Sequence, residues 1–260
     1  MSKILIVGAG NMGFSFATAL KKIIPQDDIF VVDKNTAKLQ GLFINNISTD
    51  ASDFLDQVDT VLLAIKPQVF ESFCLDFKDK LKDKFVISIM AGVSLSKIQN
   101  QTGSDKVIRS MPNLAVSVER SVIGWIASKK VDETQKSLIT KIFDVLGFSF
   151  EVKKELELNF ITALCGSGPA YFFYLTEILQ EQALEFGFDS EIAKKLAENT
   201  LFGASKLIQK NDLQAKTWKE KVTSKGGTTE AALLYLYQND FAKIFKAAIQ
   251  KANQRSQELS

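Results

Sequence analysis

The 260-residue sequence predicts an α/β domain built on a doubly wound, parallel sheet and followed by an all-α domain. Two observations lead to this prediction. Short apolar, β-rich runs alternate with longer segments of helical spacing in the first half, the order typical of a parallel sheet with helices on both faces. After about residue 152, only helical spacing continues. We therefore expect one domain over residues 1–152 and a second over residues 153–260.

The strands of the first domain are expected where apolar runs are short and bounded by turn residues. In chain order, these runs are 3–7, 29–33, 60–65, 85–89, 106–109 and 121–127. Between them, helical spacing predicts helices at 12–23, 68–81 and 94–101. The clearest helices of the second domain are expected at 171–186, 190–208 and 241–257, with a shorter one over 229–237.

The charge-free stretch 158–176 approaches the length of a membrane span, but Gly166-Ser167-Gly168-Pro169 interrupts it. We therefore expect two buried helices joined by a tight turn, and no membrane partner. The apolar helix near 171–179 indicates more apolar surface than one subunit can cover, which favours a homodimer or a higher homo-oligomer.

Composition excludes several functions. Lys and Arg number 32 against 30 Asp and Glu, and they are spread along the chain, so no basic block predicts a nucleic-acid partner. Histidine is absent, which removes the commonest general base and metal ligand, and we expect no metal site. Cys74 and Cys165 lack a pairing or metal-binding spacing, which favours a cytoplasmic location.

A glycine-rich loop joins the first expected strand to the first expected helix. The first glycine permits a tight turn, the second lets the backbone approach a pyrophosphate, and the third allows close helix packing. The helix N-terminus then offers free N–H groups to the anion. Because strand, loop, helix and a later acidic residue all stand in the required order, we expect a Rossmann-like dinucleotide site formed by Val7, Gly8, Ala9, Gly10, Asn11, Met12, Gly13 and Asp33.

The choice between NADPH and NADH stays open at this point. Asp33 would accept hydrogen bonds from a ribose and repel a 2′-phosphate, which favours NADH. Lys34 and Asn35 directly beyond it could engage a 2′-phosphate if the carboxylate turned away. Ala64-Ile65-Lys66-Pro67 follows a buried strand, where ligands collect. Lys66 there either faces the cofactor or is a solvated residue that opens a helix at Pro67.

Several segments together resemble one enzyme family. They are the loop at 8–13, Ala64-Ile65-Lys66-Pro67, Ala91-Gly92-Val93, Arg109-Ser110-Met111-Pro112-Asn113, Gly166-Ser167-Gly168-Pro169-Ala170-Tyr171 and Ser224-Lys225-Gly226-Gly227-Thr228-Thr229. With these segments in order, the chain is similar to pyrroline-5-carboxylate reductases over nearly its whole length. The last two segments are the most specific, because glycine loops and Lys-Pro turns occur in many dinucleotide-binding enzymes.

The resemblance implies hydride transfer from NADPH, or NADH, to the imine carbon of 1-pyrroline-5-carboxylate, giving proline in the last step of its biosynthesis. A protonated imine already carries its activating charge, which suits a protein without histidine. Consecutive N–H groups in a glycine turn at a helix start can hold the substrate carboxylate. The resemblance implies that Thr229 reaches the ring nitrogen and that Asn113 lies near the nicotinamide. The implied substrate-binding residues are Ser224, Gly226, Gly227, Thr228, Thr229 and Ser167.

Two other readings are a cofactor-sensing protein, which departures from the family pattern would fit, and a β-hydroxyacid dehydrogenase, which also joins a Rossmann domain to a helical one. Leu114 and Ala115 stand where a Thr-Pro pair is usual, and Lys225 replaces a proline. A cofactor-sensing protein without turnover would tolerate such changes, although the intact turn at 226–229 argues against it. A β-hydroxyacid dehydrogenase would need a lysine and an asparagine early in the second domain, and residues 166–174 contain neither.

Overall fold

The computed structural model describes residues 3–210 and 213–259, which contacts divide into two compact units. One unit is Met1–Ser167 with Ala252–Ser260, and the other is Gly168–Lys251. Strands give way to helices after β8, near the boundary expected at residue 152. The first unit extends beyond residue 152, to Ser167, because α6 (Glu157–Ile161) packs on β6 and β7. The boundary at 152 therefore stays a prediction.

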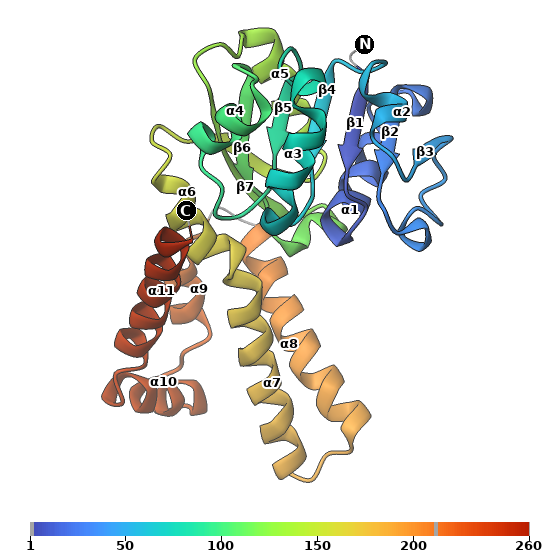
Figure 1. The fold of residues 1–260 in the computed structure, drawn as a ribbon. Helices are drawn as coiled ribbons and strands as arrows, with labels where there is room; N and C mark the ends of the chain where they lie inside the picture. Colours follow the sequence, from blue (N-terminus) through green and yellow to red (C-terminus); the bar gives the residue numbers. More distant parts are fainter. Residues whose placement is uncertain (1–2, 211–212, 260) are drawn as a thin grey trace. The chain divides into compact units, whose positions relative to one another are not determined.

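The first unit contains one eight-stranded sheet, in the order β3-β2-β1-β4-β5-β6-β7-β8 (Figure 1). Every neighbouring pair is parallel except β6–β7. The strands are β1 (Ile4–Val7), β2 (Ile29–Val32), β3 (Asn46–Ser48), β4 (Thr60–Leu63), β5 (Phe85–Ser88), β6 (Val107–Met111), β7 (Ser121–Ala127) and β8 (Gly147–Glu151). The predicted α/β fold class is confirmed, and each of the six expected strands is present.

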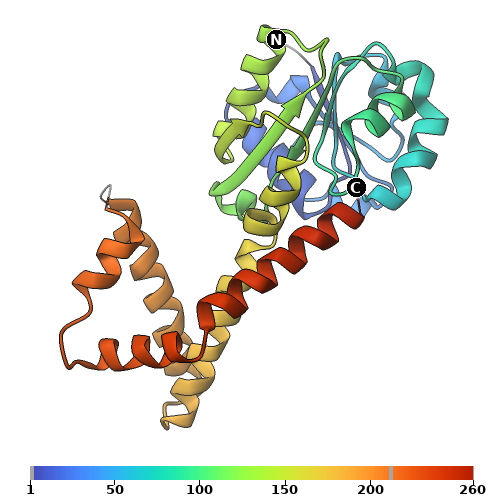
Figure 2. The ribbon, with the colours of Figure 1, turned by 90° about the vertical axis from the view of Figure 1, so that its left-hand side faces the viewer.

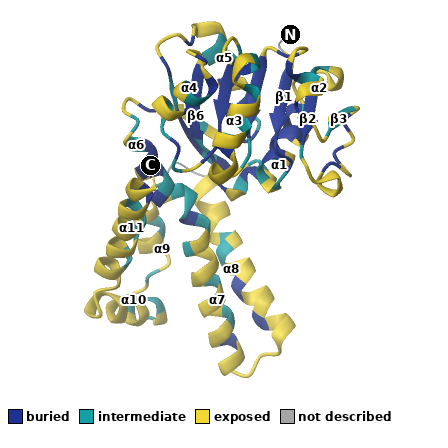
Figure 3. Ribbon diagram, in the orientation of Figure 1, coloured by how far each residue is buried: buried dark blue, intermediate teal, exposed yellow. Residues whose placement is uncertain are grey.

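Helices cover both faces of this sheet, whose strands are buried (Figure 3). On one face, α1 (Asn11–Leu20) and α5 (Glu133–Asp144) pack with side chains such as Ile4 and Ile6. On the other face, α2 (Ser52–Leu55), α3 (Pro67–Leu81) and α4 (Leu95–Thr102) pack with Leu5 and Val7. Alternate residues of β1 therefore point to opposite layers, as the period of a strand requires.

The segment after β8 differs from the expected helix–turn–helix. The chain forms α6, then a π-helical turn over Thr162–Gly166, a bend at Ser167, and α7 (Gly168–Glu185). The tight turn expected at 166–169 is therefore wrong. A π turn adds one residue to a helical turn, and this accommodates Pro169 without ending the helical path.

The second unit is helical. Its elements are α7, α8 (Ser190–Lys210), α9 (Ala215–Lys221), α10 (Thr228–Gln238) and the part of α11 (Phe241–Glu258) that ends at Lys251. The two views of Figures 1 and 2 both show α7 and α8 side by side. Many large apolar side chains of this unit are exposed, among them Phe172, Phe173 and Tyr174. Among the described residues, no helix combines the length and apolar character that crossing a bilayer requires.

Candidate functional site

The glycine loop between β1 and α1 has a geometry that only glycine meets at two positions. Gly8 has φ +102° and donates its N–H to the Val32 carbonyl at 2.7 Å. A Cβ on Gly8 would lie 2.6 Å from the Ala64 carbonyl oxygen, and a Cβ on Gly13 would lie 1.9 Å from the Gly8 oxygen. Gly13 therefore lets α1 start close against the loop, as the sequence predicts.

Gly10 is different, because a Cβ there would meet nothing within 4 Å. It is the N-cap of α1, with φ −68°, and no side chain caps this helix end. Asn11 and Met12 form its first turn, so their backbone N–H groups lie at the positive end of the helix. Open space before an uncapped helix start fits a pyrophosphate group.

Asp33 holds this loop from the end of β2. One carboxylate oxygen accepts a hydrogen bond from the Ala9 N–H at 2.8 Å, and the other accepts from the Asn35 N–H at 2.9 Å. Lys38 Nζ lies 3.4 Å from the first of these oxygens. The Asp33 side chain is only 11% exposed, and through these hydrogen bonds it acts as a brace, that is, it holds the loop in place. Lys34 beside it is exposed.

The segment Ala64-Ile65-Lys66-Pro67 lies beside the loop at the carboxyl end of β4. Ala64 donates its N–H to the Val7 carbonyl at 2.8 Å, and its own oxygen faces Gly8. Lys66 is the exposed N-cap of α3 and Pro67 is its first residue. The structure thus brings the loop, Asp33 and this segment together at the carboxyl ends of β1, β2 and β4.

Asn113 is buried just beyond β6 and its side-chain amide is engaged at both ends. Its Nδ2 donates to the Cys165 carbonyl at 2.8 Å, and its Oδ1 accepts from the Ala115 N–H at 3.2 Å. Cys165 belongs to the π turn, which ends directly before Ser167. No pattern in the sequence indicates that these two segments meet.

The turn over 224–229 opens α10, with Gly227 as the N-cap. Gly226 has φ +74°, and Gly227 donates its N–H to the Ser224 carbonyl at 3.0 Å. The Gly226 N–H donates to the Glu230 carboxylate at 2.6 Å. Thr228 and Thr229 are the first two residues of α10.

Glu230 is a site residue that sequence reasoning missed. It is the third residue of α10, the position from which a glutamate reaches back over a helix start, and this spacing could have revealed it. Its carboxylate occupies an N–H group that was expected to hold the carboxylate of the substrate.

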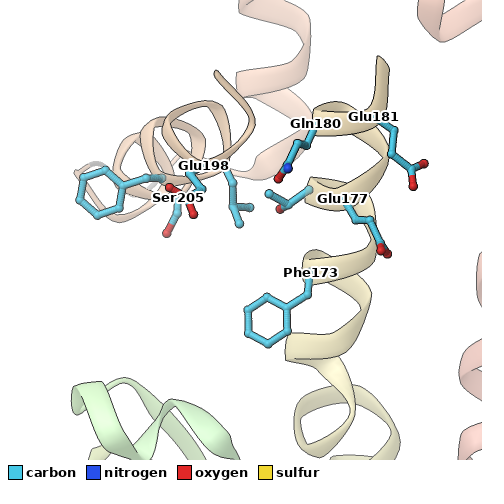
Figure 4. A pocket seen from close by; sticks show the side chains of 9 residues that line it. Phe173, Glu177, Gln180, Glu181, Glu198 and Ser205 are labelled. Atoms are coloured by element: carbon cyan, nitrogen blue, oxygen red, sulfur yellow. The ribbon is translucent and has the colours of Figure 1, made fainter. Parts of the chain in front are cut away.

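Two cavities are lined by other residues. A cavity of about 730 Å³ lies between α7 and α8 and is lined by Phe173, Glu177, Glu181, Glu198 and Phe202, among others (Figure 4). Another lies at the amino ends of β4 and β5, where Thr60 and Phe85 line it. No predicted site residue lines either cavity.

Burial raises the pKa of the Cys74 thiol to about 12 and raises the pKa of Cys165 as well, so both thiols are held neutral. Among the described residues, no three Cys, Asp or Glu side chains gather as metal ligands would.

Comparisons with known proteins show the family. A model described as pyrroline-5-carboxylate reductase dimerisation matches residues 155–259, and one described as NADP oxidoreductase coenzyme F420-dependent matches residues 3–92. A pyrroline-5-carboxylate reductase of Pasteurella multocida is 36% identical, over 98% of this chain and 97% of its own length.

Solved structures are similar over the same extent. A pyrroline-5-carboxylate reductase from Coxiella burnetii has 32% identity and a TM-score of 0.91, covering 100% of this chain and 98% of its own. A pyrroline carboxylate reductase of Plasmodium falciparum, solved with NADP bound, has 26% identity and a TM-score of 0.87, covering 99% and 98%. Loop, fold and full-length relatives therefore agree that this chain belongs to the pyrroline-5-carboxylate reductase family.

Proposed function

We propose that this chain reduces 1-pyrroline-5-carboxylate to proline with NADPH, or less readily with NADH. One observation supports this proposal above all. The same chain has an open glycine loop at Gly10 and a glycine turn that opens α10. The first has room for a dinucleotide pyrophosphate, and the second would hold the substrate carboxylate in place of that of Glu230. Bound NAD(P)H supplies the hydride.

The chain's own residues have three tasks in this reaction. The first is to hold the dinucleotide against the loop, braced by Asp33, and the residues proposed for this are Val7, Gly8, Ala9, Gly10, Asn11, Met12, Gly13, Asp33, Lys34, Ala64, Ile65, Lys66 and Pro67. The second is to anchor the substrate carboxylate on Ser224, Gly226, Gly227 and Thr228, with Ser167 in the pocket wall. The third is to orient the ring nitrogen and steer its proton, which falls to the Thr229 hydroxyl.

The preference for NADPH follows from the environment of Asp33. Both of its oxygens accept hydrogen bonds from backbone N–H groups, and Lys38 lies beside one of them. This engagement lowers the repulsion that a free carboxylate would exert on a 2′-phosphate, and exposed Lys34 adds positive charge nearby.

A homodimer, or a larger homo-oligomer, formed through the helical unit belongs to the same proposal. The dimerisation model covers residues 155–259, and the unit exposes Phe172 by 54% and Phe173 by 59%. Apolar surface of this extent is typical of an interface. Light scattering after size-exclusion chromatography should give a mass of at least two chains. A cytoplasmic location stays a prediction.

The direct test is a rate measurement. Purified protein is mixed with 1-pyrroline-5-carboxylate and either NADPH or NADH, and loss of the reduced-nicotinamide absorbance is followed. Oxidation should require the imine. Thr229→Ala should lower kcat about ten- to hundredfold. Thr223→Ala is the matched control, because its hydroxyl bonds the Lys219 carbonyl, and it should keep the rate. Cofactor binding without oxidation would instead support the sensor reading.

A further inference from the structure

Pro169 creates a local problem for the helical path that begins at Glu157. A proline has no N–H, so residue 169 cannot donate to the carbonyl four residues earlier, which is that of Cys165. Its ring also crowds that carbonyl in a regular α-helix. The chain widens just before this point into the π turn Thr162–Gly166, in which the Ser167 N–H donates to the Thr162 carbonyl at 2.8 Å.

The Asn113 side chain supplies a donor where the proline has none. Its Nδ2 lies 2.8 Å from the Cys165 carbonyl oxygen. The orientation of the amide is fixed, because its Oδ1 accepts from the Ala115 N–H at 3.2 Å and a nitrogen could not. The Asn113 backbone N–H in turn donates to Ser121 Oγ at 3.0 Å, which holds the residue against β7.

Packing around this bond leaves little freedom. Asn113 is 9% exposed. A Cβ on Gly166 would lie 3.0 Å from the Met111 methyl group, so the π turn already touches the end of β6. The Cys165 and Met111 side chains both pack against the small apolar cluster of Val152, Leu158 and Ile161. Without this donor, the carbonyl of the partly buried Cys165 would lose its side-chain hydrogen bond to the end of β6.

We infer that Asn113 is a positioning residue: it replaces the N–H that Pro169 lacks, and so holds the π turn and Ser167 at the carboxyl end of β6. This inference rests on the proposed function for its effect on turnover. It differs from the cofactor contact expected for Asn113, because both ends of its amide are engaged within the protein. Substrate handling should then depend on Asn113, whereas NADPH binding should not.

The test is a double-mutant cycle between Asn113→Ala and Pro169→Ala, read by two methods. Pro169→Ala restores an N–H that can donate to the Cys165 carbonyl. Hydrogen–deuterium exchange of the peptide covering 162–168 should rise by up to about tenfold in Asn113→Ala, the factor expected for one lost hydrogen bond. In the Pro169→Ala background, the same change should raise exchange by less than about threefold. Equal effects in both backgrounds would overturn the inference.

Enzyme kinetics are the second measurement. Asn113→Ala should raise KM for the imine or lower kcat by about tenfold, while the NADPH dissociation constant stays within about twofold. Asn113→Asp, which keeps the Ala115 acceptor but offers no donor to Cys165, should behave like the alanine variant. Ser117→Ala is the control, since its hydroxyl donates to the Leu114 carbonyl at an exposed position.

Two outcomes would contradict the positioning role. A weakening of NADPH binding as large as the change in KM would make Asn113 a cofactor contact, and wild-type behaviour of Asn113→Asp would show that the donor is unnecessary. If the wild-type protein reduces no imine, the proposed function fails, and the exchange cycle still decides the role of Asn113.

Discussion

Replacing two glycines of the same loop with alanine should separate folding from cofactor binding. A Cβ on Gly13 would lie 1.9 Å from the Gly8 carbonyl oxygen. Contact between such atoms begins near 3.5 Å, so loop and helix would have to part by roughly 1.5 Å. The obstacle is backbone, which cannot swing aside as a side chain can. We expect Gly13→Ala to lower the free energy of unfolding by about 3 kcal/mol, the upper end for overpacking.

Gly10→Ala is the matched comparison. Its Cβ would meet nothing within 4 Å and its φ of −68° is accessible to alanine. The cost to folding should be at most about 1 kcal/mol, that of a weaker helix N-cap. The methyl group would, however, project where the backbone is expected to approach the pyrophosphate. NADPH affinity should therefore fall at least about tenfold in a protein that folds normally.

Thermal unfolding followed by circular dichroism and NADPH titration followed by fluorescence distinguish the two effects. Gly13→Ala should lower Tm by about 6 to 12 °C, and Gly10→Ala by no more than about 4 °C. A Gly10→Ala protein that binds NADPH as the wild type does would refute the placement of the pyrophosphate. An unchanged Tm in Gly13→Ala would refute the packing argument.

Three other predictions concern Asp33, Glu230 and Cys74. Asp33→Ala should weaken NADPH and NADH binding together, because the Ala9 N–H loses its acceptor; a gain in NADPH affinity alone, by isothermal titration, would contradict the role as a brace. Glu230→Ala frees the Gly226 N–H and should lower KM for the imine two- to fivefold, about 0.4 to 1 kcal/mol. KM for 1-pyrroline, which lacks the carboxylate, should not change; equal changes for both would exclude competition for the carboxylate site. Cys74, whose pKa lies near 12, should resist alkylation at pH 8 in the folded protein and react after denaturation, as mass spectrometry would show.

Much of the fold could be predicted because the local pattern and the tertiary structure agree. The run at 3–7, the glycine loop and Asp33 stand in the order that a dinucleotide-binding unit needs, and the structure forms it. β3 was missed because Asn46–Ser48 has a single apolar residue and gains its order from pairing with β2. β8 was missed although Phe148 and Phe150 alternate with polar residues, since the change to helical spacing follows at once.

The contacts within the candidate site could be predicted less well. The bond from Asn113 to Cys165 joins residues 52 positions apart, and no local pattern reports such a meeting. The π turn depends on Pro169 and on the packing of Met111 against Gly166, and without that packing a tight turn was the simpler expectation. Glu230, by contrast, stands at a recognisable helix position and could have been found.

The most direct test of the proposed reaction uses NADPH labelled with deuterium at the transferable position of the nicotinamide. With 1-pyrroline-5-carboxylate and catalytic amounts of protein, we predict proline carrying a single deuterium at carbon 5, in amounts equal to the NADPH oxidised. Unlabelled proline, or no proline while NADPH still binds, would contradict direct hydride transfer to the imine carbon.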